Sequence, residues 1–251
     1  MKTFFLKLRR TILSKFIPEI FWPVSVNIAG AIIPIRNEPF SFGTKWILKK
    51  NEYEGAEIEL VKQLLNGGEH ILEMGTSIGV LTRVMSNLIG PSGKIISVEC
   101  NDTLYKSCLR WNTDYPNIVL LKGYGFPVYT VPDNLSIDGY SDDLGSLGTQ
   151  IDFSVKTDNV NKNEFIIDIK TVEDKFSFKP SILVIDVEGS EELMVETAFH
   201  LPEHIKHIII ELHGGMYKKQ VETQDAIISA IKNDGFALNK TIAGSYHFAR
   251  N

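Results

Sequence analysis

The chain has few cysteines and no long apolar run, and both absences narrow what it can be. Its two cysteines, Cys100 and Cys108, have neither the spacing of a metal site nor the number needed for a disulfide framework. We therefore expect reduced thiols and a cytoplasmic location. No stretch is long and apolar enough to span a bilayer as a helix.

Positive charge is not in excess either. The formal net charge is −5, whereas domains that bind DNA or RNA usually carry a basic patch. We therefore expect no nucleic-acid partner. A length of 251 residues with 43% apolar residues suits one large domain with a sizeable core.

The N-terminal segment, residues 1–17, allows two interpretations. Lys7, Arg9 and Arg10 interrupt what would have to be the apolar core of a signal peptide, so we do not expect secretion. As a helix the segment can lie on a membrane surface, although its basic residues do not gather on one helical face. The alternative is a helix that docks on the protein or on a second subunit. Residues 1–50 are predicted to be a helical or irregular extension, apolar enough to support a homo-oligomer.

From residue 51 onward, apolar runs alternate with amphipathic stripes. Continuous apolar strands between helices indicate a mostly parallel sheet covered on both faces, which is a Rossmann-like, doubly wound α/β fold. Residues 51–251 are predicted to form this domain, with two C-terminal antiparallel edge strands at 236–242 and 245–249. The predicted strands before them are 70–74, 94–99, 117–122, 181–185 and 207–210. The predicted helices are 58–65, 79–89, 102–111, 191–199 and a stretch around 227–231.

The alternation breaks between residues 124 and 179, where Gly, Ser and Asp cluster. Alternating segments near 151–157 and 164–170 predict a hairpin. Because a structureless loop of this length is uncommon in a compact domain, we expect a cap or lid insertion that shapes the pocket of an acceptor.

The segment Glu-Met-Gly-Thr-Ser-Ile-Gly, residues 73–79, joins the first of these strands to its helix. Its glycines let the backbone turn sharply and approach a ligand, and the helix N-terminus offers unpaired N–H groups. The next strand ends on Glu99, about 20 residues further, where an acid can accept hydrogen bonds from a ribose diol. This order predicts a nucleotide-type cofactor site.

The spacing of the turn distinguishes between cofactors. Glu-x-Gly-x-x-x-Gly differs from the Gly-x-Gly-x-x-Gly of dinucleotide sites, and no Gly-Lys-Ser/Thr is present. The Glu73 carboxylate would repel a pyrophosphate and attract a cation, which favours S-adenosylmethionine over NAD or ATP. The alternative is an ordinary turn whose glycines serve only the backbone. The expected cofactor-binding residues are Glu73, Gly75, Thr76, Ser77, Gly79, Glu99, Asn101 and Asp186.

Further polar residues follow two later strands, at the sheet edge where doubly wound folds bind ligands. His213 can act as a general base, and Asp186 can act as a base, orient an acceptor or bind a cation. Glu188 also suits the N-terminal end of a helix, and His213 can instead bond to loop backbone. The candidate catalytic residues are Asp186, His213, Glu188 and Glu211. Asp186, Glu211 and His213 are also the ligand candidates if Mg²⁺ or Ca²⁺ binds, but without a fixed local spacing we expect metal-free chemistry.

Together these residues resemble the class I S-adenosylmethionine-dependent methyltransferases and, more narrowly, the FkbM family. The resemblance runs from about Tyr53 to His213 and includes the acids of Tyr-Glu-Gly-Ala-Glu at 53–57. Its most specific part, Ile-Asp-Val-Glu-Gly-Ser-Glu at 185–191, is similar to the family's Asp-Val-Glu-Gly-x-Glu signature. The chain departs from the family pattern at Glu73, Thr76 and Val184, where Asp, Ala and Lys are frequent.

The resemblance implies O-methylation of a hydroxyl group on a sugar, glycan or natural-product acceptor, and the departures leave the acceptor open. The alternative is a non-catalytic module that keeps the fold and binds the cofactor or a partner. The intact acid and histidine cluster favours the enzyme, because a binding module would be expected to lose part of it. An NAD-dependent enzyme is disfavoured by the glycine spacing.

Overall fold

The computed structural model describes residues 18–143, 148–155, 165–213 and 221–250. The helix and the membrane contact considered for residues 1–17 lie outside these ranges. Within them, no helix has both the length and the apolar character needed to cross a membrane.

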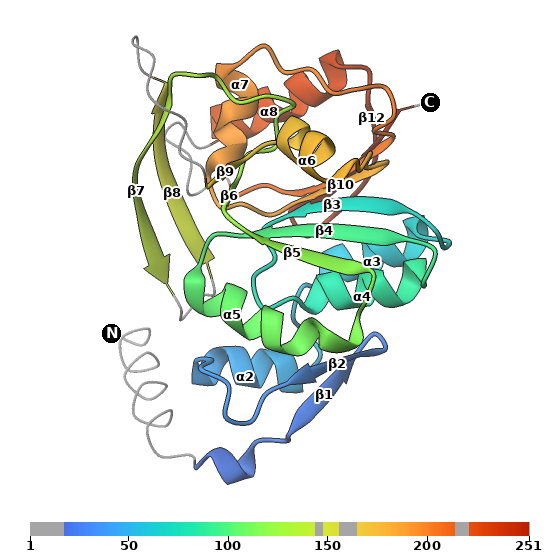
Figure 1. Cartoon of the computed structure of the whole chain (residues 1–251), viewed down its shortest axis with the longest axis vertical. Helices are drawn as coiled ribbons and strands as arrows, with labels where there is room; N and C mark the ends of the chain where they lie inside the picture. The colour runs from blue at the N-terminus through green and yellow to red at the C-terminus, as the bar shows by residue number, and fades with distance from the viewer. Residues whose placement is uncertain (1–17, 144–147, 156–164, 214–220, 251) are drawn as a thin grey trace.

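A seven-stranded sheet forms the centre of the protein, in the order β12-β13-β11-β10-β3-β4-β5 (Figure 1). The five strands from β11 to β5 are parallel, and β13 pairs antiparallel with both β11 and β12. This confirms the predicted doubly wound sheet with an antiparallel edge. The strands are β3 (His70–Met74), β4 (Lys94–Glu99), β5 (Ile118–Lys122), β10 (Ile182–Ile185), β11 (His207–Glu211), β12 (Ala237–Ile242) and β13 (Ser245–Ala249).

Helices cover both faces of the sheet, with α3, α4 and α5 on one side and α6, α7 and α8 on the other (Figure 1). Successive residues of the inner strands point into opposite cores: Leu72 and Leu183 into one, Ile71 and Ile182 into the other. Both faces are therefore apolar, which explains the unbroken apolar runs. The helices are α2 (Phe42–Lys49), α3 (Gly55–Leu64), α4 (Val80–Ile89), α5 (Asp102–Trp111), α6 (Ile169–Phe176), α7 (Leu193–Glu196) and α8 (Val221–Asn233), with 3₁₀ turns η1 (Glu19–Phe21), η2 (Asn112–Asp114) and η3 (Ser190–Glu192).

Strand β3 lies between β4 and β10. The chain first adds β4 and β5 on one side of β3 and later adds β10 and β11 on the other side. A reversal of strand order leaves a crevice at the carboxyl ends of the two central strands, where ligands bind in such folds. The sheet topology thus places Glu99, Asp186, Glu211 and His213 around one edge.

The hairpin predicted from residues 151–157 and 164–170 is wrong. Strand β7 (Leu135–Asp143) pairs antiparallel with β8 (Gly148–Val155), while β9 (Ile166–Ile167) pairs parallel with β6 (Tyr124–Gly125). The chain then enters α6, because the Asp168 carboxylate accepts the Thr171 N–H at 2.7 Å and caps the helix. It also accepts the Val131 N–H at 2.8 Å, a tertiary contact that no local pattern reveals.

The helix predicted over 191–199 is shorter than expected. It consists of η3 followed by α7, and it ends at Glu196 because Thr197 is extended. The Thr197 hydroxyl donates to the Leu193 carbonyl at 2.7 Å. The same carbonyl accepts the Thr197 N–H at 3.1 Å, so Thr197 caps the last turn with both groups.

Residues 18–50 contain a hairpin that the sequence pattern did not predict. Strands β1 (Ser25–Ile28) and β2 (Ala31–Pro34) pair across a turn in which Ala29 and Gly30 have positive φ. Buried side chains of this hairpin and of α2 join the core beneath α3 and α4. The segment also exposes Ile20, Phe21 and Val24, and a homo-oligomer through residues 1–50 stays a prediction.

Candidate functional site

A cavity of about 500 Å³ opens at the carboxyl ends of the central strands. Its size falls within the range of roughly 300–1,000 Å³ typical of small-molecule sites. The structure brings four of the predicted cofactor-binding residues together with all four candidate catalytic residues. Those that line the cavity are Gly75, Ser77, Glu99, Asp186, Glu188, Glu211 and His213.

Gly75 is required by the packing of the two central strands. Its φ is +92°, and an added Cβ would lie 1.7 Å from the carbonyl oxygen of Asp186. The Asp186 N–H donates to the Met74 carbonyl at 2.9 Å, which holds the two strand ends together. The first glycine of the turn therefore permits contact with the backbone of β10 and positions Asp186 beside it.

Glu99 lies in the cavity at the end of β4 and is 5% exposed. One carboxylate oxygen accepts the Ser77 N–H at 2.8 Å, and the other accepts the Asn101 N–H at 2.7 Å. Carboxylate oxygens are acceptors only, which is what the hydroxyl groups of a ligand require. The role of Glu99 at a ribose stays a prediction.

The other predicted cofactor residues support the turn from outside the cavity. Asn101 caps α5, where its side-chain oxygen accepts the N–H groups of Thr103 at 2.9 Å and Leu104 at 3.1 Å. The Thr76 hydroxyl bonds to the hydroxyl of Ser97. The predicted residues that do not line the cavity are Glu73, Thr76, Gly79 and Asn101.

Glu73 lies beneath the turn and is 1% exposed. Burial raises its pKa to about 7, against hydrogen bonds from the hydroxyls of Ser97 and Thr82 that lower it, and the charge of Glu99 raises it further. The Thr82 bond is 2.7 Å long. Through these hydrogen bonds Glu73 connects β3 to β4 and α4. Because Glu73 does not line the cavity, it can attract a bound cation only by long-range electrostatic interaction.

Two cavity residues that the sequence reasoning did not select precede α3. The Tyr53 hydroxyl bonds to the Ser77 hydroxyl at 2.9 Å, and the Glu54 carboxylate accepts the Leu81 N–H at 2.9 Å. Burial raises the pKa of Glu54 well above its usual range, and the charge of Asp186 adds to the effect. An acid near the start of a helix is already explained by its favourable interaction with the helix dipole, so its position alone does not indicate a binding site. The resemblance at 53–57 was the one signal in the sequence that pointed to this segment.

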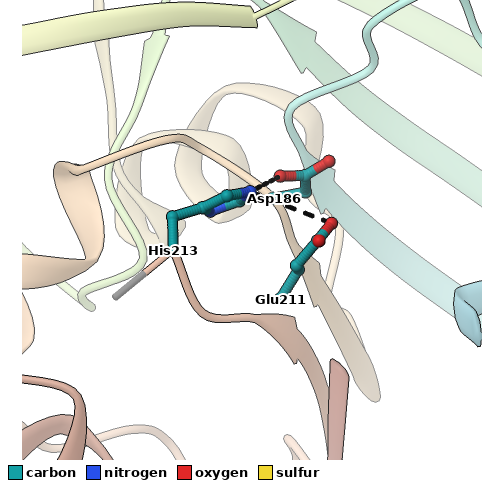
Figure 2. A group of neighbouring side chains, drawn as sticks. All are labelled: Asp186, Glu211 and His213. Carbon is teal, nitrogen blue, oxygen red and sulfur yellow. Dashed lines mark ion pairs between the residues drawn. The ribbon is translucent and has the colours of Figure 1, made fainter. Parts of the chain in front are cut away.

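His213 lies beside the carboxylates of Asp186 and Glu211 (Figure 2). Its Nε2 atom is 3.4 Å from Asp186 Oδ1 and 3.9 Å from Glu211 Oε2. Its Nδ1 atom is 3.5 Å from Glu191 Oε1, a side chain with no exposed surface. Glu191 was not among the predicted site residues, although it ends the signature at 185–191, and the fold places it behind the imidazole.

The positions of these carboxylates shift the pKa values of His213 and Asp186. Burial opposes a charge on His213, but Glu191, Asp186 and Glu211 outweigh it and raise the pKa of His213 to about 9. Burial also raises the pKa of Asp186 well above its usual range, although the His213 charge opposes this. His213 is therefore protonated near neutral pH, and the predicted role of free imidazole as a base loses support.

The charge of the whole cavity is strongly one-sided. Seven acidic side chains line it, and no lysine or arginine does so within the described part of the chain. Such a surface attracts cations and opposes a pyrophosphate. The acidic lining residues are Glu52, Glu54, Glu57, Glu99, Asp186, Glu188 and Glu211.

One protein family matches part of the chain. Residues 31–126 match the sequence model described as protein-L-isoaspartate(D-aspartate) O-methyltransferase. This stretch contains the glycine turn, Glu54 and Glu99, and it ends before Asp186. The match therefore concerns the cofactor half of the cavity, and the acceptor side lies outside it.

Solved structures of methyltransferases resemble the chain at low identity. Fibrillarin of Aeropyrum pernix, in complex with natively bound S-adenosylmethionine, is 14% identical over 73% of this chain and 66% of that one, just under two thirds of its length, with a TM-score of 0.42. An S-adenosylmethionine-dependent methyltransferase from Aquifex aeolicus is 14% identical, with coverages of 78% and 88% and a TM-score of 0.39. Precorrin-6y C5,15-methyltransferase from Geobacter metallireducens is 12% identical, with coverages of 87% and 98% and a TM-score of 0.44.

Similarity at this level says nothing about the substrate of the chain. The family match and the geometry of the cavity together support a class I methyltransferase that binds S-adenosylmethionine.

Proposed function

We propose that the protein transfers the methyl group of S-adenosylmethionine to a hydroxyl oxygen of a sugar, glycan or natural-product acceptor. The acidic cavity over the glycine turn is the observation that carries this proposal. S-adenosylmethionine presents a sulfonium and an ammonium group, whereas NAD and ATP present phosphates. The charge of the lining therefore matches this cofactor.

Two carboxylates recognise different ends of the cofactor in this proposal. Glu99, which lines the cavity and is held by two backbone N–H donors, accepts hydrogen bonds from the ribose hydroxyls. Glu54 receives the ammonium group. Because the charges of Asp186 and Glu73 oppose ionisation of Glu54, a bound cation relieves this repulsion and stabilises all three carboxylates.

Methyl transfer needs an aligned acceptor and a site for its proton. The acceptor oxygen attacks the methyl carbon as its O–H bond breaks, the C–S⁺ bond breaks in line, and a neutral thioether leaves. We assign the proton to the Asp186 carboxylate, which lines the cavity at the end of β10 and has a second oxygen besides the one nearest His213. Glu188 and Glu211 line the same side of the cavity and orient the acceptor.

The insertion between residues 124 and 179 is proposed to shape the acceptor pocket. Gly123 and Gly125, where the chain leaves β5, line the cavity. The β7–β8 hairpin extends beside the edge of the sheet where α5 begins (Figure 1), and β8 contacts η3, which carries Glu191. The hairpin thus stands next to the proposed acceptor side.

Calorimetry tests the cofactor assignment directly. The chain should bind S-adenosylmethionine and its demethylated product, S-adenosylhomocysteine, and should not bind NAD or ATP. Glu54→Gln should weaken binding of S-adenosylmethionine by about 10-fold or more, the loss expected for a charge-assisted hydrogen bond. Glu59→Gln removes the same charge from an exposed position on α3 and should leave the affinity unchanged.

The acceptor class is tested with radiolabelled methyl groups on matched acceptors. Transfer to a sugar hydroxyl, and none to the deoxy analogue at that position, would support the proposal. Binding of NAD, failure to bind S-adenosylmethionine, or transfer only to nitrogen or carboxyl acceptors would contradict it.

A further inference from the structure

Asp186, Glu211 and His213 meet at the ends of the neighbouring strands β10 and β11, and their ligand-type atoms all lie within 4.8 Å of one another (Figure 2). We propose that these three side chains bind one divalent cation of the manganese or zinc type. The cation would occupy the acceptor side of the cavity. Its part in methyl transfer, where it would hold an acceptor oxygen, rests on the proposed function.

The distances within the cluster suit an ion better than hydrogen bonds. His213 Nε2 is 3.4 Å from Asp186 Oδ1 and 3.9 Å from Glu211 Oε2. Both exceed the usual N–H···O range of about 2.7–3.2 Å. With metal–ligand bonds of about 2.0–2.2 Å, two ligands of one ion lie about 2.9–4.2 Å apart. Both separations from His213 therefore fall in the range expected for two ligands of a common ion.

The buried carboxylate of Glu191 is a second and independent indication. Its Oε1 atom lies 3.5 Å from His213 Nδ1 and has no hydrogen-bond partner among the described residues, although the side chain is completely buried. Its other oxygen accepts the Gly189 N–H at 2.6 Å and so is held in place. Metal-binding histidines usually donate their second ring N–H to such a carboxylate. With Nδ1–H directed to Glu191, a bound cation would replace the Nε2 proton that otherwise faces Asp186 and Glu211.

Asp186 shows the same lack of a partner. Its Oδ1 atom is buried and makes no hydrogen bond within the described residues, whereas buried carboxylate oxygens are normally satisfied. The carboxylates of Glu211 and Glu188 line the same cavity. A divalent cation would satisfy this oxygen and offset the surplus charge.

The donor set indicates which ion fits. Mg²⁺ and Ca²⁺ prefer oxygen ligands alone, and they were the ions considered from the sequence. One imidazole with two carboxylates suits borderline transition ions such as Mn²⁺ or Zn²⁺. Three protein ligands leave further coordination positions for water or an acceptor oxygen, as in catalytic rather than structural sites.

Mn²⁺ is the probe for this site because its electron paramagnetic resonance reports binding without any enzymatic turnover. Titration of chelator-treated full-length protein should show one bound Mn²⁺ per chain, and spin-echo spectra should show coupling to an imidazole nitrogen. Asp186→Asn and His213→Gln should each weaken Mn²⁺ binding by about 10-fold or more, and His213→Gln should remove the nitrogen coupling. Glu191→Gln, which acts through His213, should weaken it by about 10- to 100-fold.

The control is Glu52→Gln, which removes a lining carboxylate outside the cluster and should change Mn²⁺ affinity less than twofold. Circular dichroism and thermal melts identify any variant that fails to fold, and the nitrogen coupling of the unaltered protein tests the site without a variant. No stoichiometric binding, no nitrogen coupling, or equal weakening by Glu52→Gln and Asp186→Asn would overturn the inference.

Calorimetry with S-adenosylhomocysteine on the same chelator-treated sample separates the two proposals. Cofactor binding without Mn²⁺ binding overturns only the cation site, and the reverse overturns only the methyltransferase assignment.

Discussion

Replacing Glu73 with glutamine removes the ionisable group beneath the glycine turn and keeps its shape. Burial raises the pKa of Glu73 from 4.5 to about 7 in the folded chain. Because one pKa unit corresponds to about 1.4 kcal/mol, the difference corresponds to about 3 kcal/mol of unfolding free energy. A glutamine side-chain oxygen can still accept the hydroxyls of Thr82 and Ser97, which donate to the glutamate now.

The raised pKa determines the sign of the effect. Between pH 4.5 and 7 the folded chain holds a proton on Glu73 that the unfolded chain has released. The stabilisation is fully present below pH 4.5 and is lost as pH rises through about 7. Glu73→Gln should therefore match the unaltered protein near pH 4.5 and exceed its stability at pH 8 by up to about 3 kcal/mol.

Urea unfolding followed by circular dichroism at pH 4.5 and pH 8 measures this difference. Other buried acids titrate in both proteins, so their contributions cancel when the two free energies are subtracted at each pH. The exposed acid Glu59, changed to glutamine, is the control and should show no pH-dependent difference. A Glu73→Gln difference that is the same at both pH values would refute the reasoning.

Three further predictions concern the cofactor. Glu99→Ala should weaken S-adenosylmethionine binding by about 1–3 kcal/mol, because it leaves charge-assisted hydrogen bonds unmade; unchanged affinity in calorimetry would exclude Glu99 from the ribose site. Gly75→Ala should abolish cofactor binding and lower the thermal midpoint, because its Cβ would lie 1.7 Å from the Asp186 carbonyl oxygen. The control is Gly55→Ala, where a Cβ meets nothing within 4 Å; equal effects of the two changes would contradict the packing argument. Binding of S-adenosylmethionine should release protons as its positive charge lowers the raised pKa values of Glu54 and Asp186, and the uncharged sulfur of S-adenosylhomocysteine should release fewer. Calorimetry in buffers of different ionisation enthalpy measures this release, and equal values for the two ligands would argue against a cation at these acids.

The sheet and its cofactor turn were predictable because their signals are local. Apolar runs of strand length separated by amphipathic stripes indicate a buried parallel sheet wherever they occur. Glycines in the turn and an acid at the next strand end follow the chain in order, and the structure places Gly75 and Glu99 in one cavity. The hairpin predicted across 164–170 was wrong because the contact of Asp168 with Val131 crosses 37 residues.

The acceptor side of the cavity was decided by tertiary structure. By itself the sequence determined which strands end in acids and a histidine, and so which residues would share an edge of the sheet. It did not determine that Glu54 would lie beside Asp186, or that Glu191 would stand behind His213. Those positions depend on the insertion of β10 between β3 and β11 and on the burial that this packing produces. Burial and the distances between charged groups set the pKa values of these side chains. The sequence does not reveal them, because the residues come together only when the chain folds.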